Sequence, residues 1–423
     1  MSNRQVPRLA AHAGWDLEQW LEHMVLIHPQ DIELGLGRSA KVYAELALNM
    51  MDKTVVTVAG TNGKGTTCAM IEKAILLSGK SVAVYSSPHL IEYRERVRIN
   101  GKMLSEQQHC QAFEKVENVR GETALTYFEF GTLAALQLMS DSQADMLILE
   151  VGLGGRLDTV NIVEPNIAVI TSIDLDHQAW LGDNKEDIAR EKAGIFRTKI
   201  KAVIGEIDPP HSLYEAAKLH RVAGSWQGQD FSYTEDQQGF NWHNHHLNYK
   251  GLPLPHIPAQ NASTALQVID LLGLKLDKSQ LIQLFANTQL PGRGQIIQHK
   301  PMVILDVAHN PQATRHLAAQ ITKCEYRKLY LVTAMLADKD IEQSLSPLLD
   351  FSAHWLLASL DVPRGATSTQ LNSVLDTGQK VLEFPDVSQA YCQALELAKP
   401  DDLIVVFGSF FTVSIVLQLI QKR

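Results

Sequence analysis

Cysteine is scarce in this sequence, and no two cysteines have the spacing of a zinc site. Cys68, Cys110, Cys324 and Cys392 are the four present among 423 residues, and they lie far apart. This pattern indicates neither a disulfide framework nor a structural zinc site, and it favours a reducing cytoplasm as the compartment.

Long apolar runs and basic blocks are missing as well. No stretch of about 18 apolar residues is available to span a bilayer, and residues 1–7 lack the apolar segment of a secretory signal. The chain has 38 Lys and Arg against 47 Asp and Glu, with a net charge of -9 at pH 7 and no compensating basic cluster. Nucleic acid and membrane are therefore not expected as partners. We expect a cytoplasmic monomer.

Short apolar runs alternate with helix-like segments along most of the chain, which is typical of βαβ units around a mainly parallel sheet. The sequence predicts an α/β protein with a first domain at residues 1–290, a linker at 291–296 and a smaller C-terminal domain at 297–423. The C-terminal domain is expected to be Rossmann-like although it lacks the dinucleotide glycine fingerprint. Strands are predicted at residues 54–59, 81–85, 146–151, 166–173 and 202–205, and at 302–307, 328–333, 355–358, 380–383 and 403–407. A turn-rich stretch at 224–258 predicts an antiparallel hairpin region.

A glycine-rich turn, Gly60-Thr-Asn-Gly-Lys-Gly-Thr66, follows the first predicted strand. Backbone amides of such a turn and the positive end of the next helix bind phosphate, and Lys64 can reach the terminal phosphates. The first domain is therefore predicted to be a P-loop ATPase domain. Two residues separate Gly60 from Gly63, and Gly65 stands between the lysine and the first threonine, which argues against an ordinary GTPase or kinase.

Polar residues end three further strands of the first domain. Ser87, Glu150 and His177 would lie at one edge of a parallel sheet, where ligands gather. A hydroxyl, a carboxylate and an imidazole beside a triphosphate predict a magnesium site. Taken singly, each residue also has a structural explanation: Ser87 as a turn former, Glu150 as a strand-end carboxylate and His177 as a helix cap.

Other candidates carry open alternatives. Lys192 is predicted either as a solvated helix residue or as a lysine whose amine reacts with carbon dioxide to give a metal-binding carbamate. Glu129 lies in an apolar helical stretch. If it is buried there, its carboxylate needs a partner or a ligand, and the alternative is that it faces solvent. In the C-terminal domain, Asp306-Val-Ala-His-Asn310 and Gly408-Ser-Phe-Phe411 follow apolar strands and are placed to bind something in the interdomain cleft.

Together these motifs resemble the folylpolyglutamate synthase family of the Mur ligases, and above all its bacterial bifunctional dihydrofolate synthase/folylpolyglutamate synthase members. The resemblance runs in order from about residue 31 to residue 409. It implies an ATP-dependent ligase whose active site lies in the interdomain cleft. The matching motifs are the P-loop, Ser87-Pro-His-Leu90, Glu150-Val-Gly-Leu-Gly-Gly-Arg-Leu-Asp158, Asp176-His177, Arg190-Glu-Lys-Ala-Gly194, Asn261-Ala, Pro291-Gly-Arg293 and Asp306-Val-Ala-His-Asn310.

The resemblance also implies roles for individual residues. Lys64, Lys192 and His177 would be catalytic, with Lys192 as N6-carboxylysine, and Ser87, Glu150 and His177 would bind two Mg²⁺ ions. His309 and Ser409 would receive L-glutamate. ATP would contact Asn62, Gly63, Lys64, Gly65, Thr66, Asn261, Arg293 and Asp306. The pterin of dihydropteroate or a reduced folate would meet the loop at residues 31–38 (Glu33, Leu34, Gly35, Leu36), the turn Thr126, Tyr127, Phe128 and Glu129, and the residues Leu157, Asp158 and Thr159.

The implied reaction forms an amide through an acyl phosphate and needs no enzyme nucleophile. Two other classes stay open. The first is a Mur-type or cyanophycin-type ligase with another acceptor, and the second is a non-catalytic ATP-dependent switch or binding module.

Overall fold

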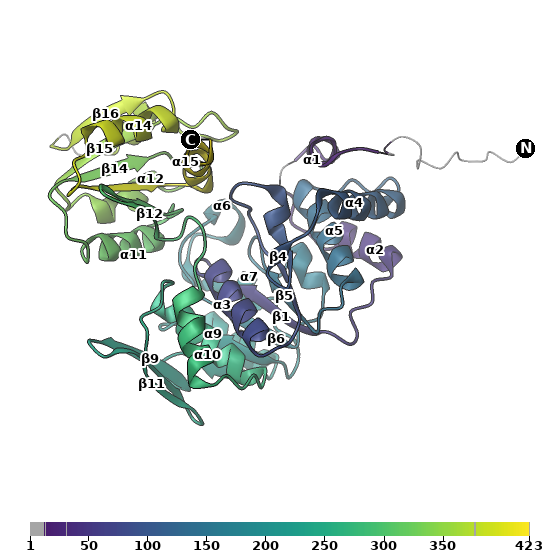
Figure 1. Ribbon diagram of the computed structural model, residues 1–423. Coiled ribbons are helices and arrows are strands. Elements are labelled where there is room, and N and C mark those ends of the chain that lie inside the picture. The colour runs from purple at the N-terminus through teal and green to yellow at the C-terminus, as the bar shows by residue number, and fades with distance from the viewer. Residues whose placement is uncertain (1–11, 13, 31, 376–377, 423) are drawn as a thin grey trace, which may run out of the picture.

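A computed structural model describes residue 12 and residues 14–30, 32–375 and 378–422. Figure 1 shows two units side by side, a larger one built on an eight-stranded sheet and a smaller C-terminal one built on a six-stranded sheet. A three-stranded antiparallel sheet adjoins the larger unit. Within the described ranges no helix is long and apolar enough to cross a membrane.

The eight-stranded sheet has the order β4-β3-β2-β5-β1-β6-β7-β8. Its last six strands in that order are parallel, and β3 and β4 are antiparallel additions at one edge. This agrees with the α/β fold predicted from the sequence. The strands are β1 (Thr54–Ala59), β2 (Val82–Tyr85), β3 (Val97–Ile99), β4 (Lys102–Met103), β5 (Met146–Glu150), β6 (Ile167–Ile170), β7 (Lys201–Ile204) and β8 (Ala223–Trp226).

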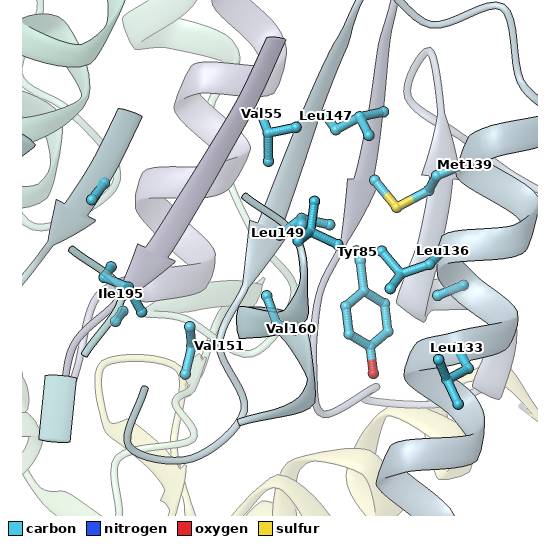
Figure 2. Close-up of a cluster of buried hydrophobic side chains, with 14 of the residues drawn as sticks. Val55, Tyr85, Leu133, Leu136, Met139, Leu147, Leu149, Val151, Val160 and Ile195 are labelled. Atoms are coloured by element: carbon cyan, nitrogen blue, oxygen red, sulfur yellow. The ribbon is translucent and has the colours of Figure 1, made fainter. Parts of the chain in front are cut away.

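Both faces of this sheet are covered, as expected for near-continuous apolar strands. Alternate side chains of one strand enter different cores: Val55 packs with the cluster drawn in Figure 2, and Val56 packs on the opposite face. The helices on the side of Val55 are α1 (Leu17–Leu26), α2 (Gly37–Leu46), α4 (Glu106–Arg120), α5 (Tyr127–Asp141), α7 (Lys185–Ala193) and α8 (His211–Leu219). Those on the side of Val56 are α3 (Lys64–Leu77), α9 (Ala259–Leu271) and α10 (Lys278–Asn287).

The hairpin region differs from the prediction at its start. Ala223–Trp226, which contains glycine and serine and gives no clear strand signal, is the parallel edge strand β8 of the main sheet. The antiparallel sheet consists of β9 (Phe231–Asp236), β10 (Gly239–Asn244) and β11 (Asn248–Leu252). Phe240 and Trp242 of β10 are buried in the same core as α9 and α10, so this sheet lies on the P-loop helix side.

The C-terminal sheet has the order β12-β13-β17-β14-β15-β16 and is parallel apart from β12. β12 was not predicted from the sequence, and it begins at Gln295, inside the segment predicted to be a linker. The strands are β12 (Gln295–His299), β13 (Met302–Leu305), β14 (Leu329–Thr333), β15 (Ala353–Ala358), β16 (Lys380–Phe384) and β17 (Leu403–Phe407). Its helices are α11 (Pro311–Ile321), α12 (Ile341–Leu345) and α13 (Ser368–Asn372) on one face and α14 (Val387–Leu397) and α15 (Phe410–Gln421) on the other.

Candidate active site

The P-loop joins β1 to α3 and requires glycine at two positions. Gly60 and Gly63 have φ of +154° and +84°, in the region that favours glycine. A Cβ on Gly60 would overlap the Thr171 hydroxyl, and one on Gly63 would lie 2.5 Å from the Asn261 side-chain oxygen. The glycines therefore let the loop lie directly against β6 and α9.

Lys64 is the first residue of α3, at the end of the glycine-rich turn, and its side chain is partly buried. Its ammonium donates to the carbonyl of Gly60 at 2.9 Å, which folds the side chain back over the loop. Burial lowers the pKa of Lys64, and the charges of Glu150 and Asp176 oppose that shift. A cation held in this way suits a phosphate ligand.

The three predicted metal-binding residues follow neighbouring strands. Ser87 comes after β2, Glu150 ends β5 and His177 follows β6, so the P-loop after β1 lies between the last two. Glu150 is buried and accepts a hydrogen bond from the Ser87 amide; burial raises its pKa, and the charges of Lys64 and Arg293 hold it down. His177 directly precedes α6 (Gln178–Leu181) without a side-chain cap bond, and 38% of its side chain is exposed at the cavity.

These donors fit a hard divalent cation. Among the described residues, the buried carboxylate of Glu150 has one hydrogen-bond donor, the Ser87 amide, so it retains free acceptor capacity. Two oxygen donors and one imidazole beside a phosphate-binding loop match the ligands that Mg²⁺ and Mn²⁺ accept.

Lys192 is buried, with 3% exposure, on the inner face of α7. The alternative of a solvated helix residue is therefore wrong. Burial lowers the pKa of Lys192 to about 7, helped by the charge of Lys64 and opposed by Asp176 and Asp158. The lowered pKa favours the neutral amine, which is the form that reacts with carbon dioxide.

One cavity of about 610 Å³ joins these groups and is lined from both domains. Lys64, Ser87, Glu150, His177 and Lys192 line it from the first domain. The C-terminal domain contributes residues after β13, β14 and β17, including both residues predicted to bind glutamate. Residues that follow strands of the two sheets therefore line one cavity.

Asp176 is the carboxylate that ties the C-terminal domain to this site. It accepts hydrogen bonds from Lys339 at 2.7 Å and from Asn310 at 3.0 Å, and its Oδ2 lies 3.6 Å from His309 Nε2. Burial alone would raise its pKa, but His309, the charge of His177 and Lys339 hold it well below the ordinary value. Asn310 also exchanges two hydrogen bonds with Asn62 of the P-loop, at 3.1 and 3.0 Å.

The residues predicted to bind ATP form two layers. Asn62, Gly63, Lys64, Gly65 and Arg293 line the cavity. The others lie behind it: Asn261 donates to the Thr66 hydroxyl at 2.9 Å, and Asp306 accepts from the amides of Gly294 and Ala308.

The predicted glutamate-binding residues both reach the cavity. The ring of His309 contacts Phe410, and its Nδ1 donates to the Val307 carbonyl at 2.8 Å, which leaves Nε2 toward Asp176. Ser409 caps α15 and forms a hydrogen bond with the Thr412 hydroxyl at 2.7 Å.

The three segments predicted to bind the pterin meet behind the wall of this cavity, where the Tyr127 ring lies beside the lining residue Arg96. Arg38 joins two of them, because it contacts Glu33 and lies 3.1 Å from Glu129. The predicted turn at 126–129 is instead the start of α5, where Thr126 and Glu129 form a capping box. Asp158 holds the third segment through the amides of Leu153 and Val160, and burial raises its pKa to about 6.

These segments pack together, although none of their predicted residues lines the 610 Å³ cavity itself. The short helix η3 (Thr159–Ile162) contacts both α2 and α5. Leu34, Gly35, Leu36 and Leu157 are partly exposed around it, as are Tyr127 and Phe128, whereas Thr159 is buried. Residue 31 lies outside the described residues.

Several residues that line the cavity were not predicted from the sequence. Lys339 comes six residues after β14, beyond the strand end where ligands are sought. Arg96 belongs to the run Arg94-Glu-Arg-Val-Arg98, which resembles an exposed charged segment, yet it is buried beside His89. Nothing in the residue pattern distinguishes it from its neighbours.

Comparison with known proteins agrees with this arrangement. The chain matches the model of the Mur ligase middle domain over residues 58–268 and that of the Mur ligase glutamate ligase domain over residues 292–410. With a P-loop in the first domain and a second α/β domain across the cavity, the fold and site define a Mur ligase.

The chain belongs to the dihydrofolate synthase/folylpolyglutamate synthase family. It is 42% identical to the dihydrofolate synthase/folylpolyglutamate synthase of Escherichia coli (strain K12) over 97% of both chains. The structure of E. coli FolC in complex with DHPP and ADP has a TM-score of 0.94 at 42% identity, covering 97% of this chain and 99% of that one. A bifunctional folylpolyglutamate synthase/dihydrofolate synthase with Mn, AMPPNP and L-glutamate bound has a TM-score of 0.91 at 42% identity, covering 99% and 100%. The predicted family and fold class are confirmed.

Proposed function

We propose that this protein is a bifunctional ATP-dependent ligase. It joins L-glutamate to dihydropteroate, forming dihydrofolate, and adds further glutamates through γ-linkages to reduced folates. The family membership supports both activities. The FolC structure described above holds ADP, and the structure with Mn holds AMPPNP and L-glutamate as well.

One observation carries the proposal. The cavity places a phosphate-binding lysine and a buried carboxylate on one wall and His309 and Ser409 on the other, 245 and 345 residues away along the chain from Lys64. A nucleotide switch has no use for such an opposed second wall, whereas a ligase must hold an acceptor carboxylate and an amine together.

The reaction begins with the acceptor carboxylate, which is a poor electrophile. Its oxygen attacks the γ-phosphorus of ATP, ADP leaves and an acyl phosphate forms; Lys64 offsets charge on the transferred group. The glutamate amine then attacks the acyl carbon, phosphate leaves and the amide remains after loss of a proton. Contact between Asn62 and Asn310 closes the two domains over the acyl phosphate and excludes water.

Two Mg²⁺ ions are proposed for the metal site, with Ser87, Glu150 and His177 as ligands and Lys192 as a carbamate beside them. The metal would supply charge neutralisation for the phosphoryl group. Arg293, Asn261 and Asp306 would hold the nucleotide, and the Glu33, Glu129 and Asp158 segments would hold the pterin.

The test is glutamate-dependent ADP release by the purified enzyme, with dihydropteroate and with a reduced folate as separate acceptors. Both acceptors should release ADP in step with amide formation. Release with reduced folate alone would make the protein a folylpolyglutamate synthase only. No release with either acceptor would favour another acceptor class or a nucleotide switch, which a panel of Mur-type acceptors would separate.

A further inference from the structure

Arg96 is a buried guanidinium on the wall of the active-site cavity. It ends the short helix η2 (Tyr93–Arg96), and 7% of its surface is exposed. Its Nε donates to His89 Nδ1 at 2.9 Å, and the rings of Tyr93 and Tyr127 lie 5.3 and 5.5 Å from its central carbon. An arginine stays charged at every pH at which the protein folds.

No carboxylate among the described residues pairs with this charge. The neighbouring arginines contrast with it: Arg94 binds Glu92 at 2.6 Å, and Arg98 binds Glu72 at 2.8 Å. The nearby Glu95 is occupied by the backbone amides of residues 90–92. Burying an unpaired charge is costly, and in proteins such a charge usually has a counter-ion or awaits a ligand.

The position of Arg96 indicates the ligand. Arg96 and His89 line the same cavity as Ser87, Glu150 and Lys64, on the side of the first domain. An anion bound by Arg96 would therefore share one cavity with the phosphate-binding loop. The planar fork of a guanidinium matches a carboxylate, and the neighbouring aromatic rings provide a low-dielectric wall that strengthens the pair.

We infer that Arg96 binds the α-carboxylate of the terminal glutamate of the folate acceptor. This inference rests on the proposed function and adds the residue that selects which carboxylate reacts. A terminal glutamate carries an α- and a γ-carboxylate, and extension through the side chain requires the γ-carboxylate alone to face the γ-phosphate. Holding the α-carboxylate on Arg96 directs the γ-carboxylate toward Lys64. Dihydropteroate has a single carboxylate, so its reaction does not need Arg96.

The experiment compares wild type, Arg96→Gln and Arg96→Lys on three acceptors: dihydropteroate, tetrahydrofolate, and a tetrahydrofolate analogue in which γ-aminobutyrate replaces glutamate and the α-carboxylate is absent. Arg96→Gln should lower kcat/KM for tetrahydrofolate about 100-fold and for dihydropteroate less than about threefold. Arg96→Lys should retain part of the tetrahydrofolate activity. Wild type should prefer tetrahydrofolate over the analogue, and Arg96→Gln should lose that preference.

Arg94→Gln is the matched control, because it removes an arginine of the same short helix that already has a partner, and all three rates should stay within about threefold. An equal fall of the dihydropteroate and tetrahydrofolate reactions in Arg96→Gln, or an intact preference over the analogue, would overturn the inference. Wild-type enzyme that turns over neither natural acceptor would overturn the proposed function as well, so the two failures are distinguishable.

Discussion

Lys192 shows how burial changes the chemistry of one side chain. Its pKa of about 7 lies well below that of a solvated lysine, so the neutral amine increases as pH rises through that value. Carbamate formation needs this neutral amine. At lower pH the amine is protonated and cannot react with carbon dioxide. A residue pattern cannot predict such a shift, because the shift arises from packing of α7 against the loop after β5.

We expect carbamate occupancy at Lys192 to rise with pH. Carbon NMR with isotope-labelled bicarbonate should show a carbamate signal that is several-fold stronger about one unit above the Lys192 pKa than about one unit below it. Lys192→Ala should lack the signal and be inactive, and short carboxylates in solution should restore part of its activity. An unchanged signal in Lys192→Ala would assign the carbamate to another amine.

Lys64 is the second residue at which a single substitution is informative. Lys64→Ala should lower kcat/KM by at least about 100-fold with both acceptors, because the cation that faces the phosphates is removed. The fold should be preserved, since the side chain bonds only to carbonyls of its own loop. Circular dichroism and thermal melting would check the fold, and activity within about tenfold of wild type would contradict the phosphate-binding role.

Whole elements were predictable where the local signal was strong. β1 and β17 have the predicted bounds because both are uninterrupted β-branched or apolar runs. β8 and β12 were missed because they are edge strands with weak local signals: β8 contains glycine and serine, and two of the five residues of β12 are glutamines. The site residues divide in a similar way. Ser87 and Glu150 follow apolar strands, so their position at the sheet edge could be predicted from the sequence. Arg96 and Lys339 reach the cavity through tertiary packing, which the sequence pattern does not reveal.

The link between α2 and α5 gives a prediction at the level of elements. Arg38→Ala should lower the free energy of unfolding by about 2 kcal/mol, because the buried Glu129 loses its ionic partner. Urea unfolding would measure this. In the double variant Arg38→Met with Glu129→Gln, part of the loss should be recovered.

Lys115→Ala is the matched control, because it removes an ion pair with Asp141 whose two side chains are about half exposed. Its effect should be at most about 0.5 kcal/mol. Equal effects of the Arg38 and Lys115 substitutions would show that the Arg38 bridge does not support the packing of α2 on α5.

Several side-chain contacts join the two domains, and one ion pair among them lies outside the cavity. Arg315 on α11 binds Asp174 of the first domain at 2.9 Å. Arg315→Ala should loosen closure and raise ADP release with folate in the absence of glutamate by about threefold to tenfold, because water reaches the acyl phosphate. Arg327→Ala, which loses a pair with Asp402 inside the C-terminal domain, should leave this release unchanged. A fall in ligation with no extra hydrolysis would contradict the role in closure.

The dual activity places a geometric demand on the whole molecule. The aryl carboxylate of dihydropteroate and the side-chain carboxylate of a terminal glutamate must reach the same γ-phosphate, although their distances from the pterin ring differ by a glutamate. Attack geometry tolerates about 1 Å of error, so one pterin position cannot serve both reactions. Two positions are therefore expected.

Substitutions of Glu129 and of Arg96 should then change the ratio of the dihydropteroate reaction to folate extension in opposite directions. Glu129→Gln should depress the dihydropteroate reaction more than folate extension, because Glu129 and Glu33 lie with Arg38 where the predicted pterin segments meet. Arg96→Gln should depress folate extension more. The ratio of the two activities in one preparation measures this, since a partly unfolded fraction lowers both equally. If the ratio of the two activities stays within about twofold of wild type in both Glu129→Gln and Glu33→Gln, neither residue belongs to a pterin position that only dihydropteroate uses. That outcome would contradict the expectation of two pterin positions.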